Sequence, residues 1–212
     1  MLKKIFALII MSSLCFVTLA AEIKVLSTVE NGLLAETKGK KIIFVSGTAE
    51  QMGTAHGKLL AKEIPHVSPK TMSLVAAAYC FKSGNWFYDR IEEILRRAQP
   101  HTPERFITEC ISMGKAAGIS EENALCVNFF PELFHCSGFA VRGDASLDGE
   151  LLHARVLDYM SDVNLQNYAV LQVFMPDDYY NWFSVGFASF LGTVTAMNEH
   201  GLAIGEMGGA GE

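Results

Sequence analysis

The sequence has 212 residues, 50% of them hydrophobic, and a formal net charge of −6 at pH 7. This length fits one domain of ordinary size. The acidic balance argues against nucleic acids and anionic membranes as partners, since both repel a negatively charged surface.

Residues 1–20 predict a secretory signal peptide. Lys3 and Lys4 precede an unbroken apolar run, and the segment ends in small residues up to Ala20. A stable membrane anchor is the less favoured interpretation, because the run is short for a bilayer span and Glu22 follows directly. We therefore expect an exported protein, periplasmic or extracellular. Removal of Lys3 and Lys4 changes its net charge from −6 to −8.

Residues 21–135 predict a mainly helical segment that begins with a pair of strands. The stretch EIKVLSTVENGLLAETKGKKIIFVSG alternates in the manner of a strand pair. Farther on, Thr102 is the expected N-cap of a helix with Pro103 at its first position. Gly118 is the expected stop of that helix, and Ser120 begins the next one.

Residues 136–212 predict a β-rich segment. Short apolar or alternating runs are separated by turn sequences such as GDASLDG, PDDY and NEHG, which indicates successive hairpins and an antiparallel sheet. The run YAVLQVFM is apolar on both faces, so we expect that strand to be covered on both sides. With the helical segment this gives an α+β layered domain. The ending GEMGGAGE closes no strand or helix, so we expect 136–212 to be incomplete.

The other conspicuous motifs have structural explanations. Gly53 and Gly57 lie four residues apart, which suits close helix packing rather than phosphate binding. The histidines show no metal-ligand spacing such as H-E-x-x-H, so we expect neither a metal nor another cofactor. Cys80, Cys110 and Cys126 lie in apolar helical surroundings that suit buried thiols, although an exported protein could pair cysteines in disulfides.

Cys136 stands where the helical pattern gives way to the strand pattern. Ser137 and Gly138 are small and leave room around its thiol. Such a cysteine is usually a small buried hydrophobe. Downstream, however, Arg155 and Asp158 place two charges in an otherwise apolar run, and buried charges are rare unless paired or used. Because a cation beside a thiol favours the thiolate, these residues are the candidate catalytic group.

Two catalytic schemes can use this cysteine. In the first, a papain-like scheme, His153 is the general base, and the hairpin has to bring it near Cys136. In the second, the chain is cut between His135 and Cys136, and the freed α-amino group is the base. An α-amine titrates near pH 8, which suits proton transfer at neutral pH. Asp158 then orients the amine, and Arg155 stabilises the thiolate or binds a polar substrate group.

The spacing of Arg155 and Asp158 requires a break in the strand. Residues three apart in a regular strand point to opposite faces. We therefore expect the strand to bulge or end near Leu157, so that both charges can reach one site.

Three short motifs occur in order from residue 136 onward: Cys136-Ser137-Gly138, Asp148-Gly149 and Arg155-Val156-Leu157-Asp158. Together they resemble the nucleophile hairpin of the cysteine N-terminal-nucleophile hydrolases. The resemblance is closest to the acyl-coenzyme A:6-aminopenicillanic acid acyltransferases, and choloylglycine hydrolases and acid ceramidases are more distant. The stretches GTAEQMGTAHG and TAMNEHGLAIGEMGG also resemble the acyltransferase branch, so the similarity runs through most of residues 43–209.

The resemblance implies a four-layer αββα fold and an autocatalytic cut before Cys136, which releases residues 21–135 as a propeptide or α-subunit. It implies that Cys136 is the nucleophile, Arg155 the active-site arginine and Asp158 the residue that orients the amine. The chain departs from the family at the cut, where His135 replaces a glycine. The family's oxyanion residue aligns near Gly208, with Glu206 the nearest candidate, and a late Asn or Arg would lie beyond residue 212.

The sequence therefore predicts an exported cysteine amidohydrolase or acyltransferase that acts on a small-molecule N-acyl amide through a thioester at Cys136. Hydrolysis is favoured over transfer, because acyl-coenzyme A is scarce outside the cytoplasm. Two alternatives stay open. One is a papain-like thiol hydrolase with His153 as base, and the other is an exported binding protein without enzymatic activity.

Overall fold

The computed structural model describes residues 22–133, 136–157 and 163–207. The expected signal peptide, His135, Asp158 and Gly208 lie outside these ranges. Within the described ranges, no helix is both long enough and apolar enough to cross a membrane.

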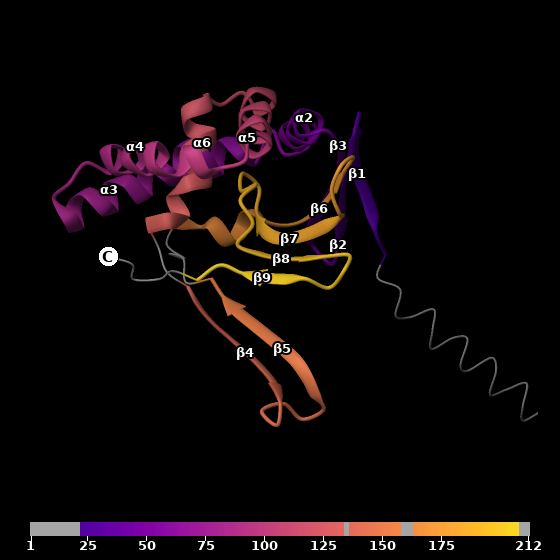
Figure 1. The fold of residues 1–212 in the computed structure, drawn as a ribbon. Coiled ribbons are helices and arrows are strands. Elements are labelled where there is room, and N and C mark those ends of the chain that lie inside the picture. Colours follow the sequence, from indigo (N-terminus) through magenta and orange to yellow (C-terminus); the bar gives the residue numbers. More distant parts are fainter. Residues whose placement is uncertain (1–21, 134–135, 158–162, 208–212) are drawn as a thin grey trace, which may run out of the picture.

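Seven strands form one sheet in the order β1-β2-β3-β6-β7-β8-β9. All neighbouring strands run antiparallel except β3 and β6, which pair in parallel from Lys41↔Val170 to Gly47↔Pro176. The strands are β1 (Lys24–Val29), β2 (Gly32–Thr37), β3 (Lys40–Gly47), β6 (Ala169–Pro176), β7 (Trp182–Phe187), β8 (Thr195–Asn198) and β9 (Ala203–Gly205). Strands from both ends of the chain thus share one sheet (Figure 1).

The helices between β3 and β4 gather on one face of this sheet (Figure 1). They are α2 (Ala49–Leu59), the π-helical turn η1 (His66–Thr71), α3 (Met72–Ser83), α4 (Phe87–Ala98), the short turn η2 (Gln99–His101), α5 (Glu104–Ala117), α6 (Glu121–Phe129) and the short turn η3 (Phe130–Leu133). A last short turn, η5 (Leu165–Tyr168), leads into β6.

Local capping explains where several helices begin and end. Ser120 caps α6 by accepting a hydrogen bond from the backbone of Asn123, and Gly118 ends α5 in the left-handed conformation, both as predicted. The predicted start of α5 is wrong by one residue. Pro103 is its N-cap, and the Thr102 hydroxyl instead donates to the carbonyl of Ala98 one turn earlier.

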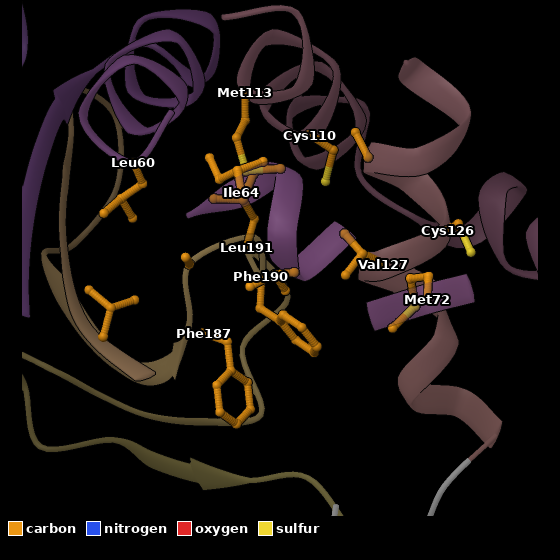
Figure 2. Packing of buried hydrophobic residues seen from close by; sticks show 14 of the residues in the cluster. Leu60, Ile64, Met72, Cys110, Met113, Cys126, Val127, Phe187, Phe190 and Leu191 are labelled. Carbon is orange, nitrogen blue, oxygen red and sulfur yellow. The ribbon is translucent and has the colours of Figure 1, made fainter. Parts of the chain in front are cut away.

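The core lies between the helices and the inner face of the sheet (Figure 2). Gly53 and Gly57 allow α2 to approach α5 closely, as predicted. A Cβ atom built on Gly57 would lie 2.3 Å from the carbonyl oxygen of Met113, and one built on Gly53 would lie 2.3 Å from that of Glu109. Two glycines one turn apart therefore set the spacing of the two helices.

The cysteines of the helical segment are unpaired thiols. Cys110 and Cys126 are buried in the core, and Cys80 is half-buried. Burial raises the pKa of Cys126 to about 12 and that of Cys110 well above its ordinary value. These thiols therefore act as small apolar side chains, which answers the question of disulfides left open by the sequence.

The α+β class is confirmed, and the described strands of residues 136–212 pair antiparallel with one another, as predicted. The parallel pairing of β6 with β3, from the N-terminal strands, was not predicted. One detail of the predicted sheet is wrong. Strand β6 is not covered on both faces by the described residues. Val170, Gln172 and Phe174 face the helices and are buried, whereas Met175 on the other face is exposed. All the described helices lie on the inner face, so the outer face lacks a covering layer from them.

Strands β4 (Ser137–Gly143) and β5 (Gly149–Val156) form a separate two-stranded sheet. This hairpin extends from the body on the side opposite the helices (Figure 1). Apart from Val141 and Arg155, its strand residues are exposed. The hairpin nevertheless carries the residues that the sequence singled out, and it meets the large sheet at β9.

Candidate active site

The hairpin brings Cys136 and Arg155 together through its register. Ser137 pairs with Val156 and Gly138 with Arg155, so Cys136 lies just before β4 and Arg155 lies one residue before the end of β5. Strand β5 ends at Val156, which confirms the break expected near Leu157. The pairing of β4 with β5 thus brings Cys136 and Arg155, which are 19 residues apart along the chain, into direct contact.

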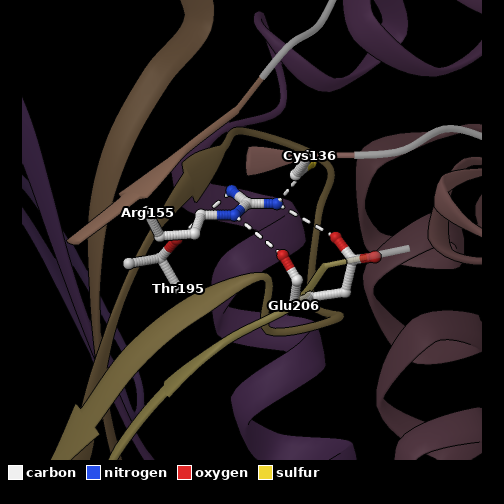
Figure 3. Close-up of polar contacts among 4 residues, drawn as sticks. All are labelled: Cys136, Arg155, Thr195 and Glu206. Carbon is white, nitrogen blue, oxygen red and sulfur yellow. Dashed lines mark hydrogen bonds and ion pairs between the residues drawn. The ribbon is translucent and has the colours of Figure 1, made fainter. Parts of the chain in front are cut away.

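The Arg155 guanidinium is the centre of a polar network (Figure 3). Its Nη2 atom lies 2.9 Å from Sγ of Cys136 and 3.0 Å from Oε2 of Glu206. Its Nε donates to the backbone carbonyl of Glu206 at 3.0 Å, and Nη1 donates to the hydroxyl of Thr195 at 3.2 Å. Each of the three guanidinium nitrogens therefore has a partner.

The arginine at the centre of this network is shielded from solvent. The Arg155 side chain is only 4% exposed, whereas the Glu206 side chain is 35% exposed. A buried charge is stable only when it is paired and hydrogen-bonded, and Glu206 supplies both the opposite charge and a carbonyl oxygen. Besides Glu206, the guanidinium contacts the Thr195 hydroxyl and the sulfur of Cys136, so part of its positive charge lies against the thiol.

The partners of Arg155 come from the last two strands of the large sheet. Thr195 opens β8, and Glu206 follows directly after β9. Thr195 pairs with Gly205, and a Cβ atom built on Gly205 would lie 3.1 Å from Cγ of Arg155. A side chain at this position would therefore push Arg155 away, so a glycine here lets the hairpin dock on the sheet.

The structure places His153 away from the nucleophile. His153 pairs with Ala140, four residues along β4 from Cys136. At roughly 3.3 Å per residue the two backbone positions are about 13 Å apart along the strand, and among the described residues the hydrogen-bond partner of the Cys136 sulfur is Arg155 and not His153. His153 does share a face with Arg155, as the alternation predicts, because a Cβ atom built on Gly205 would also lie 3.0 Å from Nε2 of His153.

The other predicted site residues have different outcomes. His135 and Asp158 lie outside the described residues, so the cut site and the amine-orienting aspartate stay predictions. The structure brings Glu206 to the site, but as a partner of Arg155. An ionised carboxylate only accepts hydrogen bonds, so we assign Glu206 to holding Arg155 rather than to stabilising an oxyanion.

Sequence reasoning missed Thr195. Its hydroxyl contacts Arg155 from 40 residues away, and a threonine at the start of a short strand carries no signal of this role. Because a buried guanidinium needs several hydrogen-bond acceptors, the sequence could predict that an acceptor such as Thr195 exists, but not where along the chain it lies.

No group of three or more histidine, cysteine, aspartate or glutamate side chains among the described residues is arranged to hold a metal ion. The site therefore offers a thiol, a guanidinium, a carboxylate and a hydroxyl. A thiol beside a buried guanidinium is suited to nucleophilic attack on a polarised carbonyl carbon.

Comparison with known proteins gives two relatives. No protein-family model matches the sequence. Protein dcd1B of Dictyostelium discoideum is 27% identical over 179 residues, which cover 74% of this chain and 36% of dcd1B. Protein dcd1A of the same organism is 26% identical over 186 residues, which cover 75% of this chain and 42% of dcd1A. The chain thus spans about two fifths of the length of these curated relatives.

Proposed function

We propose that this protein is a cysteine hydrolase of the N-terminal-nucleophile class, acting on a small-molecule N-acyl amide. Cys136 attacks the amide carbonyl, the carbon–nitrogen bond breaks, and the amine leaves with a proton. Water then adds to the thioester and releases a carboxylic acid, with the thiol restored. An acceptor amine in place of water gives acyl transfer. The nucleophile and the base proposed for these steps are both groups of the polypeptide.

One observation carries the proposal: Nη2 of a buried arginine lies 2.9 Å from the sulfur of Cys136. Burying the charged side chain of Arg155, which is only 4% exposed, costs free energy. An ion pair with Glu206 would offset that cost without a thiol beside the same nitrogen atom. The guanidinium stabilises the thiolate before attack, and its planar fork can bind the carbonyl or carboxyl oxygen of a substrate.

The position of His153 favours the α-amine over a histidine as base. The register separates His153 from Cys136 by four residues along the hairpin, whereas the amine of a chain cut before Cys136 is on the nucleophile's own residue. The proposal therefore includes autocatalytic cleavage between His135 and Cys136, with Asp158 orienting the amine.

The outer face of the sheet supports the four-layer αββα form of this proposal. Val173, Phe183 and Met197 lie in one row of paired strands, on the face away from the helices. Phe183 and Met197 are each 40% exposed. The hairpin approaches from this same side, because Thr195 and Met197 share a face of β8. A second sheet that includes the hairpin would bury this apolar row.

Maturation of the full-length protein tests the proposal. The wild-type protein is expected to appear as two chains by intact-mass analysis, the second beginning CSGFAV by N-terminal sequencing. Cys136→Ala should remain one uncut chain and be inactive on N-acyl amides. Cys126→Ala, which removes a thiol from the core, is the matched control and should still be cut. An uncut but active wild-type protein would favour a papain-like scheme, and cleavage that persists in Cys136→Ala would contradict self-processing.

Asp158→Asn tests the amine more specifically. The change keeps the shape of the side chain and removes the charge that orients the ammonium form. The catalytic rate should fall by roughly two to four orders of magnitude, as for other positioned acid–base groups, with little change in the melting temperature. Near-normal turnover in folded Asp158→Asn would contradict the α-amine as base.

A further inference from the structure

A cavity lies on the face of β8 and β9 that points away from Cys136. Thr195 and Gly205 point toward the hairpin, so their neighbours Ala196 and Ile204, which pair with each other, point the other way. Ala196 and Ile204 line a cavity of about 310 Å³. This volume is at the small end of the range for small-molecule sites, and the cavity is separated from the cysteine by the sheet itself.

The walls of this cavity are mainly apolar and aromatic. Tyr179 and Tyr180 come from the turn before β7, Trp182 begins β7, and Leu202 comes from the turn before β9. Tyr180 and Leu202 are 62% and 65% exposed. Large apolar side chains gain free energy when a ligand removes them from water, so these walls suit an apolar ligand body.

One cationic group, Arg105, stands at the wall of the cavity. Its guanidinium carbon lies 4.1 Å from the centre of the Tyr179 ring and 5.9 Å from that of Trp182. Among the described residues it forms no ion pair. The acid one turn along α5 is Glu109, and burial raises its pKa to about 7, so near neutral pH it compensates Arg105 only in part. A stacked guanidinium keeps its edge N–H groups available for an anion.

We infer that this cavity binds an amphipathic carboxylate, with its tail against the aromatic wall and its carboxylate on Arg105. The planar carboxylate matches the two parallel N–H groups of a guanidinium edge. The inference does not rest on the proposed catalytic activity, because the cavity and the cysteine lie on opposite faces of the sheet.

Fluorescence of Trp182 gives a direct readout in the full-length protein. Residues 1–212 contain two tryptophans, so Trp86→Phe removes the other one, and the difference from a Trp182→Phe variant isolates the signal of Trp182. Dodecanoate, below its micelle concentration, should change this fluorescence in a saturable way. Dodecanol, which has the same tail without the charge, and acetate, which has the charge without the tail, should each bind at least tenfold more weakly.

Arg105→Gln is expected to weaken dodecanoate binding about tenfold to a hundredfold, the usual effect of one charge-assisted hydrogen-bonded contact. Arg96→Gln, at an exposed arginine of α4, is the matched control and should leave binding unchanged. Circular dichroism of each variant checks folding. Equal binding of dodecanol and dodecanoate, or unchanged binding by folded Arg105→Gln, would overturn the inference.

Discussion

The helix-covered sheet and the β4–β5 hairpin are held in the molecule by different forces. The body is stabilised by apolar burial, with residues such as Ile43, Leu60 and Phe174 at most 1% exposed. The hairpin is exposed along most of both strands, and the main described contact that fixes it to β9 is the polar network of Arg155. Fold stability and site geometry therefore depend on different residues.

This separation has a physical consequence. Apolar burial is non-directional and scales with the area removed from water. It therefore keeps the body compact but does not determine how the side chains of the site are oriented. The guanidinium is planar and directional, so its bonds to Glu206 and Thr195 set where Cys136 and Arg155 lie relative to the sheet. Mutations in the two regions should accordingly have separable effects on stability and on activity.

The largest expected effect is on the hairpin network. Arg155→Lys keeps the charge, but a single ammonium cannot reach the thiol, the Glu206 carbonyl and the Thr195 hydroxyl at once. Activity should fall by roughly two to four orders of magnitude, while the melting temperature of the body changes little. Activity and thermal unfolding are measured on the same preparations.

Arg142→Lys is the matched control, since Arg142 is an exposed arginine near the tip of the same hairpin. It should leave both quantities unchanged. If Arg155→Lys lowers the melting temperature strongly while activity per folded molecule survives, Arg155 is a structural ion-pair partner and the site assignment is wrong.

The second effect is a pH dependence that belongs to the body alone. Burial raises the pKa of Glu109 to about 7 from 4.5, so the folded state retains a proton that the unfolded state loses between these values. This contribution to stability is complete below about pH 4.5 and is lost as pH rises through about 7. Glu109→Gln should remove the loss, which can reach about 3 kcal/mol.

His56 contributes with the opposite sign. Burial lowers its pKa to about 4 from 6.5, so its contribution is complete above about pH 6.5 and is lost as pH falls through about 4. Between about pH 4.5 and 6.5 the contributions of Glu109 and His56 to the free energy of unfolding change in opposite directions with pH. The free energies of unfolding in urea, measured at pH 5 and pH 8, should therefore differ between wild type and Glu109→Gln mainly at pH 8. Parallel pH profiles of the two proteins would contradict the assignment.

A smaller effect is expected at the contact of α2 and α5. In Gly57→Ala the new methyl group would collide with the Met113 carbonyl oxygen and with Cβ of Ala116, which lies 2.7 Å away. Overpacking should cost about 2 kcal/mol of unfolding free energy, after the gain in helix propensity is subtracted. Gly192→Ala is the control, because its nearest heavy atom is at 3.5 Å. Equal stability of the two variants in denaturant would show that the helices separate at no cost.

The sequence predicted the local features well because each has a local cause. A capping serine, a stop glycine and two glycines one turn apart act on neighbouring residues, so α6, the end of α5 and the α2–α5 contact could be anticipated. The contact between Cys136 and Arg155 could be anticipated as well, since both fall within one hairpin whose register follows from its turn. Residues joined by a short loop have few alternative arrangements.

The features that were missed involve residues distant along the chain. The parallel pairing of β3 with β6 joins strands more than a hundred residues apart, and no pattern within either strand specifies it. The same holds for Thr195, which reaches Arg155 only after β8 has been placed in the sheet. The two-faced apolar pattern of β6 indicated a cover on both sides, and the described residues supply it on one.

The smallest expected effect is at the tip of the hairpin. Leu147 is 98% exposed, so replacing it with serine removes almost no buried apolar surface. Leu147→Ser should change the free energy of unfolding by less than about 0.5 kcal/mol and leave activity intact, in contrast to Gly57→Ala in the body and Arg155→Lys in the same hairpin. Urea unfolding and turnover of the full-length protein measure both quantities. A loss of stability as large as that of Gly57→Ala would mean that the hairpin tip is buried in the full-length protein. The hairpin would then be held by apolar burial as the body is, and not mainly by the polar network of Arg155.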